Sequence, residues 1–172
     1  MRSQRVLGYL GVVAAALASI ATSQPTWDVD DEVSGLHDEL GASAPESVRH
    51  FSVESSDEHT VRVSGTLKWD LNPAAMVRVS IAKDDGSPVQ EGVYRADEAK
   101  LVGPGRRRDT VISLGQHQEC ETKPCEQGYT VTVRLEEGAP QERVFFDWRF
   151  TASMSGSGDG PPKDSYVKVV ED

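Results

Sequence analysis

Basic residues are in short supply in this sequence, with 18 Lys and Arg against 28 Asp and Glu. An acidic surface repels phosphate groups, so nucleic acid and anionic membranes are predicted to be poor partners. Cysteine is scarcer still, because the 172 residues include only two. Two cysteines are too few for the paired cysteine motifs of most structural zinc sites.

Recognised catalytic motifs are also lacking. There is no GxSxG nucleophile elbow, and the SxxK pattern of Ser165 and Lys168 stands without the companion motifs of that enzyme class. The histidines sit in four separate polar segments, at His37, His50, His59 and His117. The sequence therefore predicts a protein that is not an enzyme and has no cofactor or bound metal.

The longest apolar run predicts a cleaved signal peptide. It covers residues 6–21, which is 16 residues, whereas a helix needs roughly 20 to cross a bilayer. Arg2 and Arg5 precede the run and small residues follow it, so we expect cleavage after Ser23 and a secreted or periplasmic protein without a stable membrane anchor. An uncleaved anchor is the alternative. Loss of the two arginines leaves 16 basic residues against 28 acidic ones, a net charge of −12.

Two terminal segments lack the pattern of a folded core. Residues 24–47 are acidic and predict a flexible leader, in which Val33, Leu36 and Leu40 would fit only one short helical turn. Residues 153–172 begin as a linker rich in Gly, Ser and Pro, and their last eight residues are compatible with a further strand or a frayed tail. The folded domain is therefore predicted over residues 48–152.

Strict alternation of apolar and polar residues dominates that domain and predicts β-strands. The strongest segments are 61–71, 77–81, 129–135 and 144–150. Weaker segments are 49–54, 92–95 and 110–114. Because a polar loop separates the strands at 129–135 and 144–150, we expect residues 128–151 to form an antiparallel hairpin.

Alternation over about seven strands, with no convincing helix, predicts an all-β fold. We expect a single antiparallel two-sheet sandwich with flexible N- and C-terminal tails. Its architecture resembles immunoglobulin-like and fibronectin type III-like sandwiches, on the pattern of residues 128–151. The diagnostic immunoglobulin arrangement is absent, because both cysteines follow Trp69 in the chain.

The two cysteines predict a disulfide. Cys120 and Cys125 are the only pair in a chain expected to enter an oxidising compartment, which favours a bond between them. A less favoured hypothesis is a zinc site of His117, Cys120 and Cys125, completed by Glu121 or Glu126. A catalytic thiol is disfavoured, because in an oxidising compartment it would form a disulfide with the neighbouring cysteine.

Two places are candidates for ligand binding. Arg106, Arg107 and Arg108 form the one basic cluster, whose guanidinium groups could bind a carboxylate, sulfate or phosphate. The alternative is an exposed turn neutralised by the protein's own carboxylates. Phe145 has the opposite parity to its apolar neighbours and is expected on the outer face beside Arg149, where it would contact a sugar or protein. Equally, Phe145 could pack under the leader or the tail.

These observations lead to one main functional hypothesis and two alternatives. We expect a secreted or periplasmic β-sandwich that works as a binding or accessory module for an unidentified protein or carbohydrate. The first alternative is a structural protein that assembles through an edge strand or its C-terminal tail. The second is a metal-assisted hydrolase that uses His117 with distant carboxylates.

Overall fold

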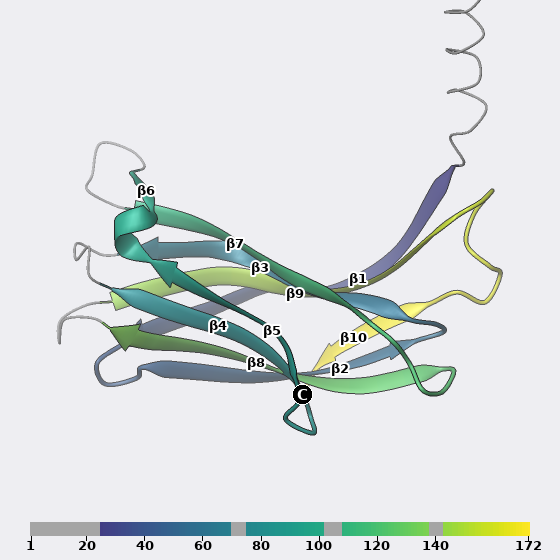
Figure 1. The fold of residues 1–172 in the computed structure, drawn as a ribbon, viewed down its shortest axis with the longest axis horizontal. Helices are drawn as coiled ribbons and strands as arrows, with labels where there is room; N and C mark the ends of the chain where they lie inside the picture. The colour runs from purple at the N-terminus through teal and green to yellow at the C-terminus, as the bar shows by residue number, and fades with distance from the viewer. Residues whose placement is uncertain (1–24, 70–74, 102–107, 138–142) are drawn as a thin grey trace, which may run out of the picture.

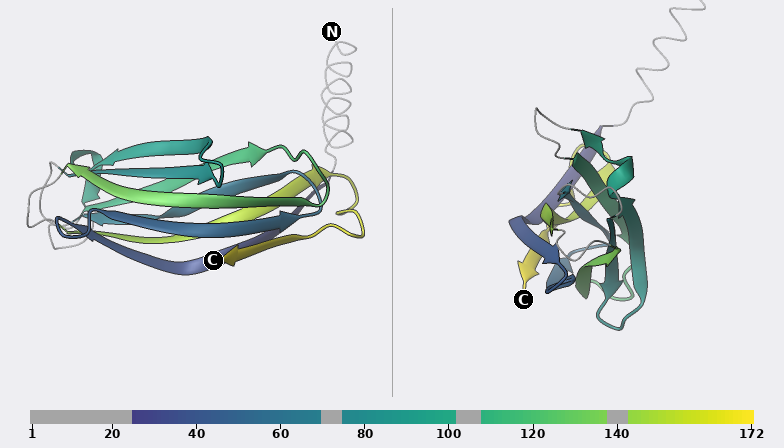
Figure 2. Two further views of the ribbon diagram at one scale, coloured as in Figure 1. Left: turned by 90° about the horizontal axis from the view of Figure 1, so that it is seen from below. Right: turned by 90° about the vertical axis from the view of Figure 1, so that its left-hand side faces the viewer.

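The computed structural model describes residues 25–69, 75–101, 108–137 and 143–172, which form two antiparallel sheets packed face to face (Figure 1 and Figure 2). Sheet A has the strand order β1 (Thr26–Gly41), β9 (Arg143–Ser157), β3 (His59–Trp69), β7 (Arg108–Gln118) and β6 (Lys100–Leu101). Sheet B has the order β10 (Val167–Glu171), β2 (Glu46–Ser55), β8 (Cys125–Glu137), β4 (Met76–Lys83) and β5 (Pro88–Arg95). A single 3-10 turn, η1 (Ala96–Glu98), lies between β5 and β6.

The predicted all-β sandwich is confirmed, and the described residues form ten strands where about seven were expected. Among the described residues, no helix has the length and hydrophobicity needed to span a bilayer. The proposed signal peptide, residues 1–23, lies outside the described residues, so secretion stays a prediction.

The core lies between the sheets and follows the alternation in the sequence. In β3, Val61, Val63, Leu67 and Trp69 are buried, whereas the even-numbered residues between them turn toward the outer face. Phe51 of sheet B stacks on Phe150 of sheet A, with 4.4 Å between the ring centroids. Burial of these side chains between the sheets supplies the main driving force for the sandwich.

The expected flexible leader differs from the structure, because most of it forms β1 at the edge of sheet A. β1 pairs with β9, and its register shifts between Val33 and Leu36. Two residues there, Ser34 and Gly35, lie opposite the single residue Arg149, which is a β-bulge. Gly35 has a φ of 74°, a value that glycine adopts without steric cost. Before the bulge the odd-numbered residues face inward, and after it the even-numbered residues do. The apolar alternation is therefore interrupted in the sequence, and the strand was not recognised.

The expected C-terminal linker and tail also differ from the structure. β9 continues to Ser157, and Gly156 leaves room for the ring of Trp27, since an added Cβ would lie 2.4 Å from Trp27 Cζ2. Farther on, β10 pairs with residues 51–55 of β2. The last residues therefore complete the edge of sheet B within the same chain.

The predicted hairpin over residues 128–151 is wrong. β8 pairs with β2 and β4 in sheet B, whereas β9 pairs with β1 and β3 in sheet A. Both strands were recognised correctly, but their apolar faces meet across the core instead of lying side by side. Alternation indicates which face of a strand is buried and carries no information about its hydrogen-bonded neighbour.

Candidate functional site

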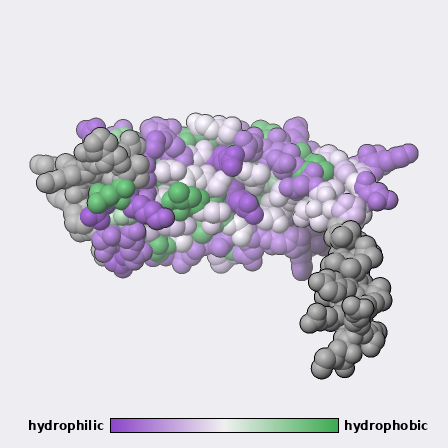
Figure 3. Space-filling model, turned by 90° about the horizontal axis from the view of Figure 1, so that it is seen from above, coloured by the Kyte–Doolittle hydropathy of each residue, from purple (hydrophilic) through white to green (hydrophobic). Residues whose placement is uncertain are grey.

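The outer face of sheet A contains a hollow with a volume of about 890 Å³. It spans β1, β9, β3 and β7, and Figure 3 shows this face as largely hydrophilic or neutral. Gly65 in the middle of β3 lines its floor. A Cβ at this position would lie 2.6 Å from the Cβ of Trp148, so a larger residue would have to displace the neighbouring strand. We call this surface the sheet A hollow.

Carboxylates of β1 form one side of the sheet A hollow. Asp28, Asp30 and Glu32 alternate on the outer face of the strand and are all exposed. Glu32 accepts an ion-pair contact from Arg149, with 3.3 Å between Oε2 and Nη1. In the part of the chain that the structure describes, Asp28 and Asp30 have no cation within salt-bridge distance. The two carboxylates are therefore available to a ligand from solvent.

Hydroxyl groups and two arginines occupy the centre of the sheet A hollow. Arg149 donates from Nε to Ser64 Oγ over 3.1 Å, which holds its guanidinium across β9 and β3. Arg62 is exposed on β3, and no carboxylate of the described residues contacts its guanidinium. Six hydroxyl side chains also line the surface, from Ser34, Ser64, Thr66, Ser113, Thr151 and Ser153. This mixture of hydroxyls, carboxylates and guanidinium groups suits a polar, hydrogen-bonding ligand.

A charged cluster around Asp147 borders the sheet A hollow. Asp147 binds Lys68 through Oδ2 and His37 through Oδ1, and the second contact measures 2.5 Å to Nδ1. Hydrogen bonds from Lys68 and then from His37 hold the pKa of the Asp147 carboxyl below its usual value. Asp147 therefore stays ionised and fixes the neighbouring cation and imidazole on the face.

Phe145 lies next to this cluster, and its position bears on both interpretations of this residue. It is half-buried on the outer face of β9, and its ring stacks on that of His37 with 6.1 Å between centroids. His37 belongs to the segment expected to be a leader, so Phe145 packs against that segment. Arg149 lies four residues along the same face and contacts the sheet A hollow directly, whereas Phe145 does not line it. A ligand contact by either residue stays a prediction.

Of the predicted arginine cluster, the structure describes Arg108, which does not line the sheet A hollow. Arg106 and Arg107 lie outside the described residues. Arg108 begins β7, and its Nη1 donates to the backbone carbonyl of Ala96 over 3.0 Å. Its guanidinium thus binds the short turn η1. Anion binding by the three arginines remains a prediction.

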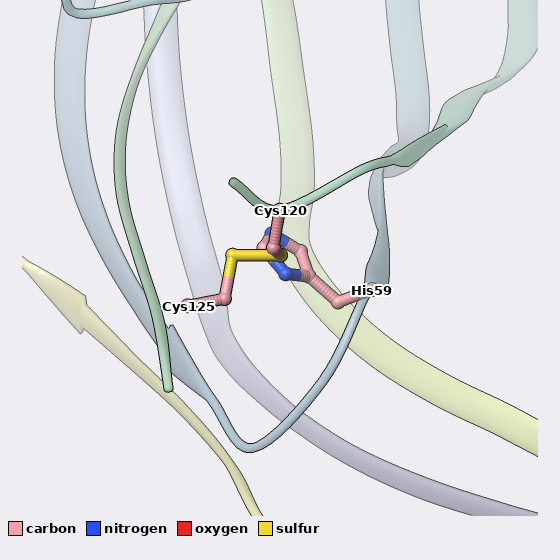
Figure 4. A group of neighbouring side chains, drawn as sticks. All are labelled: His59, Cys120 and Cys125. Carbon is pink, nitrogen blue, oxygen red and sulfur yellow. A yellow bond between two sulfur atoms is a disulfide. The ribbon is translucent and has the colours of Figure 1, made fainter. Parts of the chain in front are cut away.

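The predicted disulfide between Cys120 and Cys125 is present, with a Cα–Cα distance of 5.6 Å. Cys120 follows β7 of sheet A, and Cys125 begins β8 of sheet B. The bond therefore closes the connection through which the chain passes from one sheet to the other. Figure 4 shows the ring of His59 beside the two sulfur atoms.

His59 forms the centre of a buried polar cluster under the disulfide. Its Nε2 lies 2.8 Å from Tyr129 Oη, and its Nδ1 lies 3.0 Å from Ser55 Oγ. Because Ser55 donates its proton to the carbonyl of Asp57, Nδ1 carries the imidazole proton and Nε2 accepts from Tyr129. Burial is the main cause that lowers the pKa of His59, to about 4. A neutral imidazole therefore satisfies all of these hydrogen bonds.

The zinc hypothesis placed the wrong histidine near the sulfurs. His59, Cys120 and Cys125 offer ligand atoms within 4.8 Å of one another. His117 instead lies on the exposed end of β7, 3.2 Å from Glu58. In the oxidised protein the two sulfurs are bonded to each other, and both ring nitrogens of His59 have hydrogen-bond partners. These three residues therefore stabilise the packing between the sheets. The sequence carried no signal that His59 would be buried here.

Comparisons with known proteins assign no family. No family model matches the sequence, and no curated protein matches it. A solved structure described as "Structure of infectious bursal disease virus Gx strain" is 9% identical and has a TM-score of 0.42, over 87% of this chain and 36% of that chain. The chain thus spans little more than a third of that protein's length. Likeness at this level supports no statement about function.

Proposed function

We propose that this protein is an exported, non-catalytic binding module whose ligand site is the sheet A hollow. The observation that carries the proposal is the combination, on one open surface, of six hydroxyl side chains with the carboxylates of β1 and two arginines. The volume of about 890 Å³ falls within the range of roughly 300 to 1,000 Å³ typical of ligand sites. An immunoglobulin-like or fibronectin III-like relationship remains a prediction of the sequence.

The chemistry of the sheet A hollow favours an oligosaccharide as the ligand. Sugar hydroxyls both donate and accept hydrogen bonds, so they match hydroxyl side chains, carboxylates and guanidinium groups together. Asp28 and Asp30 would accept from hydroxyl or ammonium groups, and Arg62 would donate to ring or hydroxyl oxygens. The surface is open along the sheet, which suits a chain molecule more than a small compact one.

The two alternatives have less support. Assembly through the C-terminal strand is disfavoured, because β10 already pairs with β2 of the same chain. A hydrolase using His117 is disfavoured, because this exposed histidine has Glu58 as its partner and lies away from the disulfide. Neither alternative accounts for the polar surface on sheet A.

Oligosaccharide binding can be tested with a matched pair of arginine variants. The wild-type protein is screened on an array of neutral and amino-bearing oligosaccharides, and hits are titrated by calorimetry. We expect Arg62→Ala to weaken binding about tenfold, the effect of about 1.4 kcal/mol, because a guanidinium that binds the ligand is removed.

The control is Arg134→Ala, which removes an exposed arginine from the outer face of sheet B. We expect it to bind as the wild type does. Equal affinities for the Arg62→Ala variant and the wild type would contradict the proposal. So would the failure of every oligosaccharide to bind better than at millimolar concentration.

A further inference from the structure

The free edge of β7 differs in charge from the other strand edges of the described structure. No charged residue occurs from Thr110 to Gln116, within a chain in which 27% of residues are charged. Val111 in this stretch is 79% exposed. β6 pairs only with Arg108 and Asp109, so no strand of the described residues pairs with the rest of this edge in sheet A (Figure 1).

The other edges carry features that prevent pairing between molecules. β1 has a bulge and a row of carboxylates, which include Asp28, Asp30 and Glu32. β5 begins with a proline and contains Glu91, and β10 is only five residues long with Lys168 near its start. Charge, proline, bulges and shortness are the usual protections of a sheet edge. β7 lacks all four over residues 110–116.

We propose that two copies of this protein pair through their β7 edges, antiparallel and around a two-fold axis at Ser113. The sequence of β7 is complementary to itself in this register. Exposed Val111 faces Gly115 of the second copy, which has no side chain to obstruct it. Pairing in this register is confined to residues 110–116, because Lys100 of β6 already occupies the edge at Asp109. Ile112 faces Leu114, which continues the apolar inner face.

The pairing joins the two A sheets into one continuous surface. Ser113 is exposed and lies on the outer face together with Val111, and both residues line the sheet A hollow. A two-fold axis through Ser113 therefore places the two hollows on the same side of the joined sheet. A chain ligand could contact both copies, although the pairing itself requires no ligand.

The two-fold position provides a direct test by mass measurement. Light scattering on the secreted wild-type protein is expected to show a concentration-dependent rise to twice the mass of one chain. Ser113→Lys and Ser113→Glu should each be monomeric, because like charges then lie directly opposite each other. An equimolar mixture of the two variants should restore the dimer. The control Thr132→Lys, on the outer face of sheet B, should dimerise as the wild type does.

A cross-linking measurement checks the register independently of stability. Ser113→Cys should form a disulfide-linked dimer under mild oxidation, since position 113 lies opposite itself. Gln116→Cys should not, because Thr110 is its partner in this register. A wild type that stays monomeric at high micromolar concentration would overturn the proposal, as would a Ser113→Lys variant that still dimerises or efficient cross-linking by Gln116→Cys. None of these assays uses a ligand, so their failure is distinguishable from failure of the proposed oligosaccharide binding.

Discussion

Among the polar contacts of the described residues, two clusters between sheet A and sheet B have opposite chemistry. One is ionic: Asp38 of β1 accepts from Arg49 of β2 over 3.0 Å and from the indole of Trp148 over 2.6 Å. The other is neutral and consists of His59 with its partners Ser55 and Tyr129 beside the disulfide. A charge that leaves water needs its counter-charge, whereas a neutral imidazole needs to remain neutral. We call these two clusters the ionic joint and the neutral joint, and each should lose its stabilising effect under different conditions.

The largest effect is expected from breaking the ionic joint. Asp38→Ala removes the acceptor of Arg49, Ser47 and Trp148 at once. The buried indole N–H of Trp148 then has no acceptor, and Glu171 is the remaining counter-charge of the Arg49 guanidinium. We expect the free energy of unfolding in urea to fall by about 3 to 5 kcal/mol. Asp30→Ala on the same strand is the control, since its carboxylate is exposed, and it should change stability by less than about 0.5 kcal/mol. Similar values for the two variants would show that the Asp38 cluster does not hold the sheets together.

The neutral joint should fail as the pH falls. Unfolded His59 binds a proton near its ordinary pKa of 6.5, whereas the folded protein does not until about pH 4. The contribution of His59 to stability is therefore constant above pH 6.5 and decreases from there down to pH 4, by about 3 kcal/mol in total. Urea unfolding at several pH values measures this slope. In His59→Gln the slope over this window should disappear, and an unchanged slope would assign the effect to another group.

The smallest of the three effects concerns the disulfide beside His59. Cys120→Ser combined with Cys125→Ser should lower the free energy of unfolding by about 2 kcal/mol, because the bond closes only a short loop. The connection between β7 and β8 should then become more accessible, and hydrogen exchange of Tyr129 and its neighbours in β8 measures this change. A loss as large as that of Asp38→Ala would mean that the disulfide, and not the ionic cluster, is the dominant link between the sheets.

The strands of the core could be predicted from the sequence, because their alternation is unbroken. Residues 61–69 and 144–150 turn the expected side chains inward. The strand β1 could not be found in the same way, since the bulge at Ser34 and Gly35 moves the inward positions from Val33 to Leu36. The end of β9 was missed for a related reason. A glycine in this segment predicts a linker, and only the structure shows that the ring of Trp27 covers Gly156.

The candidate site was largely hidden from the sequence. Arg149 was identified on an outer face, but Asp28, Asp30 and Arg62 were not recognised as its neighbours. They come together only because β1, β9 and β3 are adjacent in sheet A, although β9 begins more than a hundred residues after β1 ends and more than seventy after β3 ends. The incorrect hairpin at residues 128–151 has the same cause. β8 and β9 follow each other in the chain, but β8 pairs with strands of sheet B and β9 pairs with strands of sheet A.

By itself, the sequence determined that this chain forms strands, which face of most strands is buried, and that its two cysteines are joined. These features follow from local periodicity and from the number of thiols, which any stretch of chain displays directly. Only the tertiary structure decided the order of the strands, the burial of His59 under the disulfide and the position of the sheet A hollow. Each of these depends on contacts between residues distant in the chain, and such contacts are selected by the packing of the whole core.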